Sequence, residues 1–260
     1  MITGITIRVG HFARESARHA GRAGMLLWAT ICSLRHPRLY VAETFTQAKR
    51  IGVEGLGLVL LMGALSGGVL SQQTANQLSP GLPLEIIAGS LVGGLLTELG
   101  PILTAIVLAG RMGAGIGAEL GTMQVTNQID ALLTLGRDPV LELVVPRVVA
   151  GTLILVPLVI LANIMGILAG YFVCIALIGM TPQEFAAGAK GYYHNAALFY
   201  TLLKAVVFGF TITFIACYVG LRAGGGAAGV GRTATKAVVA IIVAIMVLDV
   251  ILAPAYKAFS

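Results

Sequence analysis

Apolar residues are gathered into long runs along the whole chain, and short polar stretches separate them. Five of these runs cover roughly residues 51–73, 86–110, 148–180, 197–221 and 237–256. A helix rises about 1.5 Å per residue, so about 20 apolar residues cross the roughly 30 Å hydrocarbon core of a bilayer. The pattern therefore predicts five membrane-spanning helices.

A further apolar run, residues 21–34, is bracketed by Arg22 and Arg35 and is too short to cross a bilayer. We expect it to form an interfacial or re-entrant helix. The residues before it are rich in arginine and lack the apolar core of a secretory signal, which favours a basic strip on anionic lipid headgroups. One domain over 1–260 is predicted, with a basic N-terminal region at 1–50 and a five-span bundle at 51–260.

Composition supports a membrane protein and argues against other classes. Of the 260 residues, 57% are hydrophobic and 11% are charged, whereas a soluble domain carries about 25% charged residues. The three cysteines lie in or beside apolar runs and form no CxxC pair, so neither a disulfide framework nor a metal site is indicated. The net charge of +6 comes from residues that flank apolar runs without interleaved aromatics, which does not indicate a nucleic-acid partner.

The distribution of lysine and arginine predicts the orientation. Of these 17 residues, eight precede residue 51, three lie within 111–147 and three lie in the Gly-rich turn at 222–236. The other two connections and the C-terminus carry only Lys190 and Lys257. By the positive-inside rule, the N-terminus is expected in the cytoplasm and the C-terminus outside it, as an odd number of spans requires.

Glycine and proline are frequent in and around the spans. Glycine pairs occur at 67–68 and 93–94, and a series follows at positions 110, 113, 115, 117 and 121. Small residues let membrane helices approach closely, so these positions favour packing over a moving hinge. Pro101, Pro146 and Pro157 are expected to kink or bound the second and third spans.

The chain carries none of the short motifs that would supply its own energy or chemistry. A GxxxxGK[ST] phosphate loop requires a lysine after a glycine, and none of the five lysines follows a glycine. HExxH, GxSxG and paired-carboxylate arrangements do not occur either. An enzyme is not indicated, and active transport would need an ATPase in a separate subunit.

Three ionisable residues lie at membrane depth: Glu98, Lys204 and Asp249. Such groups cost about 2.5–3.5 kcal/mol each near the bilayer centre, so they usually pair or face a polar cavity. Lys204 and Asp249 each lie roughly 10 Å below the outer face on antiparallel spans, which predicts an ion pair. Glu98 lies a little deeper and is expected either to join the pair or to face a substrate cavity.

The long loop between the second and third spans has the pattern of an amphipathic surface helix. Its apolar positions at helical spacing are Val125, Ile129, Leu132 and Leu133. Its polar positions are Glu119, Asp130, Arg137 and Asp138. Such a helix either docks a soluble partner or only covers the bundle.

Taken together, these segments resemble one family. The pattern comprises Glu98-Leu99-Gly100-Pro101, 109–114, 118–123, Gln128, 136–139, Pro146-Arg147, Lys204 and Leu248-Asp249. From about residue 15 onward the chain is similar to the MlaE permeases. These are the membrane subunits of ABC transporters that carry phospholipids, and in some lineages sterols, across the bacterial envelope or the chloroplast inner envelope. In the family's phospholipid carriers the residue before the glutamate can be arginine, whereas this chain has Thr97.

The resemblance implies a fold, partners and a location. The fold is all-α and integral to the membrane, with five transmembrane helices, an N-terminal interfacial elbow helix and a cytoplasmic coupling helix. The partners are a second copy of the chain, two ATPase subunits that bind ATP and Mg, often a STAS-domain protein, and a periplasmic ring of MCE-domain subunits. The chain itself would bind no cofactor. The location is the bacterial inner membrane, with a periplasmic C-terminus and a role in outer-membrane lipid asymmetry.

Two functional hypotheses follow. In the first, an ABC permease for phospholipid, sterol or another hydrophobic substrate holds its cargo in a cavity formed by Glu98, Thr97, Gly94, Leu70 and Leu78. The ATPase then couples through Glu119, Gly121, Met123, Asp130 and Arg137. In the second, an ion-coupled secondary transporter uses Glu98, Lys204 and Asp249 as a proton relay. About ten or more spans in repeats are usual for that class, so five spans without a repeat favour the first.

Overall fold

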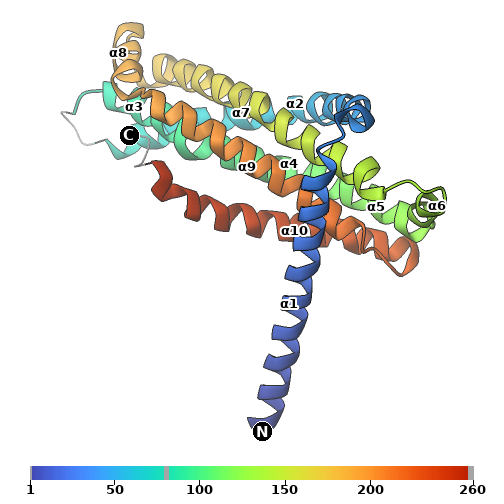
Figure 1. Cartoon of the computed structure of the whole chain (residues 1–260). Coiled ribbons are helices and arrows are strands. Elements are labelled where there is room, and N and C mark those ends of the chain that lie inside the picture. The colour runs from blue at the N-terminus through green and yellow to red at the C-terminus, as the bar shows by residue number, and fades with distance from the viewer. Residues whose placement is uncertain (1, 79–81, 257–260) are drawn as a thin grey trace.

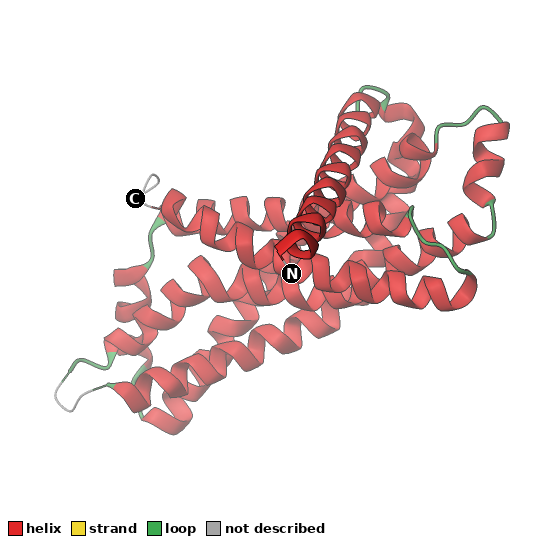
Figure 2. Cartoon of the chain, turned by 90° about the horizontal axis from the view of Figure 1, so that it is seen from below, coloured by secondary structure: helices red, strands yellow, loops and turns green. Residues whose placement is uncertain are grey.

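The computed structural model describes residues 2–78 and 82–256, and its regular structure is helical, with no strand among these residues (Figures 1 and 2). The middle of the predicted connection at 74–85 and the residues after 256, including Lys257, lie outside the described ranges. The all-α fold class is confirmed.

Five helical segments are long and apolar enough to cross a membrane: Pro37–Gln77, Glu85–Val125, Val140–Ile178, Asn195–Gly220 and Gly226–Ala255. Their α-helices are α2 (Pro37–Gln77), α3 (Glu85–Gly94), α4 (Gly100–Leu108), α5 (Ala114–Val125), α7 (Val145–Val173), α9 (Asn195–Gly220) and α10 (Gly226–Leu252). The predicted number of spans is confirmed, but the helices extend beyond the apolar runs. The first begins at Pro37 rather than near residue 51, because proline suits the first turn of a helix.

Short π-helical turns lie inside the second span and at both ends of the third. They are η1 (Leu95–Leu99), η2 (Ala109–Gly113), η3 (Val140–Val144) and η4 (Cys174–Ile178). Pro101 and Pro146 lie in the first turns of α4 and α7, directly after π turns, so both bound helical segments as expected. Pro157 lies inside α7 and does not bound it. The 3₁₀ turn η5 (Ala253–Ala255) ends the fifth span.

The apolar run at 21–34 is the C-terminal part of one long helix, α1 (Ile2–Ser33). Figure 1 shows that α1 leaves the bundle at a steep angle and that its N-terminal end lies far from the other helices. The run is therefore not a re-entrant segment. It continues the same helix as the arginine-rich residues before it.

Small residues bring the first and third spans into backbone contact. A Cβ atom added at Gly63 or Gly67 of α2 would clash with the carbonyl oxygen of Ala162 or Gly166 of α7. This spacing of small residues four apart is the usual device for close helix approach in membranes. The two helices can touch this closely only because both carry small residues at the contact.

The second-span glycines divide into packed and open positions. Gly113, Gly117 and Gly121 pack under side chains of α10 or of the turn before it. Gly93, Gly110 and Gly115 have open space where a Cβ would lie. Packing therefore accounts for only part of the predicted glycine series.

A separate apolar cluster closes one end of the bundle, where helix α8 (Pro182–Tyr192) lies on α3 (Figure 1). Its buried members are Ile87, Ala88, Leu91, Leu95, Cys174, Met180 and Phe185. The short helix α6 (Gln128–Thr134) lies at the other end. We refer to these as the α8 end and the α6 end.

Candidate functional site

The three ionisable residues of the spans meet inside the bundle. Lys204 of α9 is fully buried, and its Nζ lies 2.5 Å from Glu98 Oε2 of η1 and 2.7 Å from Asp249 Oδ1 of α10. The ammonium also lies 4.6 Å from the centre of the Tyr200 ring, a cation–π distance. The pairing expected for Lys204 and Asp249 is thus present, and Glu98 joins it. We call these three residues the charge cluster.

The π turn η1 explains why Lys204 also donates to the backbone. Gly100 N–H bonds to Leu95 O, five residues back, which leaves Leu96 O without its usual helical donor. Pro101 has no N–H, so Thr97 O lacks its donor as well. Helix α9 supplies both replacements: the Thr201 hydroxyl donates to Leu96 O, and Lys204 Nζ donates to Thr97 O at 3.1 Å.

The charge cluster is exposed mainly through Glu98. The side chain of Glu98 is 45% exposed, that of Asp249 is 17% exposed and that of Lys204 is not exposed. With two carboxylates facing one ammonium, the ionised cluster has an excess negative charge, and Glu98 is the member that presents it at the surface. The Thr97 hydroxyl is occupied within its own helix, where it donates to Gly93 O at 2.8 Å.

An apolar groove of about 400 Å³ lies between α2 and the second span. Its lining residues are Met62, Leu65, Ser66, Val69, Leu70, Gln73, Leu99 and Leu103. Leu99 directly follows Glu98, and Leu70 lies over Gly94, where a Cβ would be 3.3 Å from Leu70 Cδ2. Leu78 does not line this groove; it packs against the apolar cluster at the α8 end.

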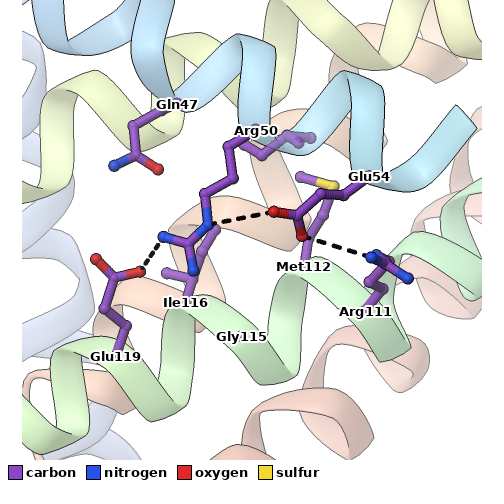
Figure 3. Close-up of a pocket in the computed structure, with 9 residues that line it drawn as sticks. Gln47, Arg50, Glu54, Arg111, Met112, Gly115, Ile116 and Glu119 are labelled. Atoms are coloured by element: carbon purple, nitrogen blue, oxygen red, sulfur yellow. Dashed lines mark hydrogen bonds and ion pairs between the residues drawn. The ribbon is translucent and has the colours of Figure 1, made fainter.

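A second group of charges joins three spans nearer the α6 end. Figure 3 shows Arg50 of α2 between two carboxylates: its Nη1 lies 2.8 Å from Glu119 Oε2, and its Nε lies 3.8 Å from Glu54 Oε1. Glu54 also faces Arg111 at 3.5 Å. Glu119 Oε1 in turn accepts from Arg147 of α7, which is 4% exposed, at 2.6 Å. These five residues form a chain of alternating sign, and a small pocket of about 60 Å³ lies beside it.

This network corrects the interpretation of Glu119. Glu119 was expected on the polar face of an amphipathic surface helix, but it binds two arginines, Arg50 and Arg147. Glu119 also lies inside the second span, because α5 belongs to that span and ends only at Val125. Glu119 therefore ties spans together rather than lying on a loop.

The predicted amphipathic surface helix is broken into two parts. Asn127 adopts a left-handed conformation, with φ of 58°, which ends the helix that contains Val125 and starts the seven-residue α6. Ile129 is buried, whereas Leu133 is exposed. A continuous helical stripe from Val125 to Leu133 is therefore wrong.

The remaining residues of this predicted coupling segment lie in different surroundings. Asp130 is exposed on α6, and Arg137 pairs with Glu142 at 3.1 Å. Met123 lines a cavity of about 380 Å³ with Leu132. Gly121 is buried, and a Cβ there would lie 3.1 Å from Ala223 Cβ. Only Asp130 among these presents an unpaired charge in the part of the chain that the structure describes.

Five helices long and apolar enough to cross a membrane, around a buried ion cluster, define a helical integral membrane protein. The chain belongs to the MlaE permease family, because the family profile described as Permease MlaE matches residues 44–255. It is 37% identical over 239 residues to a probable ABC transporter permease protein of Rickettsia felis, covering 92% of both chains. A probable ABC transporter permease protein of Synechocystis is 37% identical over 210 residues, 81% of this chain and 80% of its own.

A plant protein is also similar. Protein TRIGALACTOSYLDIACYLGLYCEROL 1, chloroplastic, of Arabidopsis thaliana is 34% identical over 215 residues, which is 83% of this chain and 61% of that protein. Family and relatives together identify the chain as an ABC-type permease, a transport subunit rather than a catalytic one. This decides between the two hypotheses in favour of the permease.

Proposed function

We propose that this permease moves phospholipid between the bacterial inner membrane and a periplasmic ring of MCE-domain subunits, and thereby helps to maintain outer-membrane lipid asymmetry. The observation that carries the proposal is the apolar groove whose wall includes Leu99, the residue that follows Glu98. A phospholipid has an apolar chain and a polar headgroup, and the groove offers apolar walls next to a half-exposed carboxylate. A sterol or another purely hydrophobic cargo would use the walls without needing Glu98.

The groove is open along α2, so a second copy of the chain is the natural cover for it. In such a homodimer the two grooves would form one cavity for the lipid. The name of the Arabidopsis relative contains that of a galactolipid, which supports a lipid as cargo for this family member too.

The energy would come from a separate ATPase that binds ATP and Mg. The α6 end carries the segments richest in arginine, so the positive-inside rule puts it in the cytoplasm and the α8 end in the periplasm. The exposed Asp130 on α6 then faces the ATPase. A STAS-domain protein would bind on the same side, as the family resemblance implies.

The test is photo-crosslinking from Val69, an exposed residue of the groove wall. A photoreactive amino acid at position 69, in the chain assembled with its ATPase, should label radioactive phospholipid without nucleotide and lose the label when ATP and vanadate trap the closed state. Glu98→Gln should weaken the crosslink to phospholipid.

The matched control is Leu153 of α7, which is equally exposed but lies outside the groove. Crosslinks from Leu153 should report bulk lipid and should not change with nucleotide. The proposal fails if positions 69 and 153 respond alike under every nucleotide condition. If a sterol probe is labelled from position 69 more strongly than phospholipid is, the cargo is a sterol.

A further inference from the structure

A second apolar groove, of about 650 Å³, lies between α9 and α10. Its lining residues are Phe210, Thr211, Phe214, Ile215, Ala240, Val243, Ala244, Val247 and Leu248. The rings of Phe210 and Phe214 are stacked with centres 5.4 Å apart, and the small side chains of Ala240 and Ala244 leave the hollow beside them. Because the chain spans a bilayer, lipid is the solvent that this surface meets.

One end of this groove carries an unpaired cation. Lys236 lies one turn before Ala240 on α10, is exposed, and has no carboxylate within ion-pair distance among the described residues. Twenty residues separate Lys236 from Tyr256, about 30 Å of helix, which matches the hydrocarbon thickness. When Tyr256 lies at one interface, Lys236 therefore lies at headgroup level at the other.

Helix α1 is attached at the same end of the groove. Tyr218, one turn after Phe214, donates its hydroxyl proton to His19 O of α1 at 2.9 Å. The Arg222 guanidinium lies 4.2 Å from the centre of the Tyr218 ring and 2.9 Å from His19 Nδ1. Arg22, exposed and three residues after His19, follows on the same part of α1.

We propose that this groove holds an anionic phospholipid of the surrounding bilayer as a resident ligand that is not transported. One acyl chain lies over Phe210 and Phe214, and the phosphate pairs with Lys236 and with Arg22 of α1. Basic residues at the membrane surface attract anionic lipids, and Lys236 lies one helical turn beyond the end of the apolar groove. The bound lipid would fasten α1 to the bundle. This site is separate from the groove proposed for the cargo.

Tryptophan quenching by brominated lipids tests the proposal. Trp28 is the single tryptophan, so the full chain with Trp28→Phe and Val243→Trp carries one reporter at the groove rim. In phosphatidylcholine vesicles we expect brominated phosphatidylglycerol to reach half-maximal quenching at a mole fraction about five-fold lower than brominated phosphatidylcholine, the effect of roughly one basic residue. Lys236→Gln, with or without Arg22→Gln, should bring the ratio of the two half-maximal mole fractions close to one.

Leu153→Trp in the same background is the control, because this lipid-facing position has no basic groove beside it; it should show no headgroup preference. Val247→Trp, also exposed on the groove wall, serves as a second reporter if Val243→Trp lowers the yield. Equal quenching by both lipids at the groove, or a preference that Lys236→Gln leaves unchanged, overturns the proposal. Absence of quenching by either lipid also overturns it and shows that another polypeptide covers the groove.

Discussion

Lys204 is fully buried, donates to Glu98 and the Thr97 carbonyl, and forms an ion pair with Asp249. Lys204→Met would leave two carboxylates facing each other without a cation, so we expect the free energy of unfolding in detergent to fall by about 3–5 kcal/mol. Asp249→Asn should cost less, because Glu98 still balances the ammonium. Adding Glu98→Gln and Asp249→Asn to Lys204→Met should recover stability. If the losses in free energy of unfolding of the three single substitutions simply add in the triple variant, this coupling is absent.

Pro101 is the reason that the Thr97 carbonyl needs Lys204. Pro101→Ala restores an N–H that can donate to this carbonyl, so the cost of Lys204→Met should shrink by about 1 kcal/mol in the Pro101→Ala background, the net value of one hydrogen bond. A double-mutant cycle measures this difference. Pro157→Ala, inside α7, is the control and should show no coupling to Lys204.

The sequence predicted part of this cluster and left part open. Depth along antiparallel spans was enough to pair Lys204 with Asp249, because both distances could be counted from the span ends. The place of Glu98 stayed undecided, because the π turn that aims it toward α9 depends on hydrogen bonds between helices far apart in sequence. The contact between Glu119 and Arg147 was missed for a related reason: nothing in the local pattern links residues of two spans.

At the scale of helices, the contact of α2 with α7 depends on Gly67. Gly67→Ala would place a Cβ against the Gly166 carbonyl, so we expect the helices to separate and the free energy of unfolding to fall by about 1–3 kcal/mol. Gly57, on the same helix, has open space around a Cβ. Gly57→Ala should therefore be neutral or slightly stabilising, and equal losses for the two variants in a detergent unfolding titration would refute the packing argument.

The N-terminus of helix α8 is held by a capping box whose stability depends on pH. Thr181 and Glu184 form a capping box in which Glu184 Oε2 accepts from the Thr181 N–H at 2.8 Å and from its hydroxyl at 2.9 Å. These bonds, the backbone one first, hold the pKa of Glu184 below its ordinary value of 4.5. The pKa of Glu184 is therefore lower in the folded chain than in the unfolded chain. Its carboxylate stabilises α8 fully at pH values above the unfolded pKa, and this stabilisation is lost as the pH falls through the folded pKa.

Hydrogen exchange of the α8 amides measures this effect. Protection should fall on acidification in the parent chain, whereas Glu184→Gln should be less protected at neutral pH and show little further change. Thr181→Ser keeps both hydrogen bonds of the box and should behave as the parent chain. An acid response that survives in Glu184→Gln would show that another group is responsible.

Span number and order could be predicted from apolar runs, whereas helix ends could not. Helices such as α2 and α5 continue past the apolar residues because their polar side chains pair across helices, as Arg50 does with Glu119. The break at Asn127 escaped prediction because the apolar spacing of Val125 and Ile129 fits a continuous helix equally well.

For the whole molecule, the two acidic residues once expected to couple to the ATPase should behave differently. Asp130→Arg changes an exposed charge on α6 and should abolish co-purification of the ATPase while leaving the unfolding temperature of the permease unchanged. Glu119→Gln removes the partner of the buried Arg147 and should lower that temperature. If Asp130→Arg leaves both the complex and lipid-stimulated hydrolysis intact, α6 is not part of the interface.

The glycine contact between α2 and α7 also constrains how the chain is synthesised. The two helices that fit most closely are separated by the whole second span, so α7 is completed about 100 residues after α2. At roughly 5–20 residues per second, the ribosome needs some 5–20 seconds for this stretch. During that interval the small-residue face of α2 stands in the membrane without its partner, while the second span inserts beside it. During membrane insertion, other helices must therefore be prevented from packing on that face of α2 until α7 has been inserted.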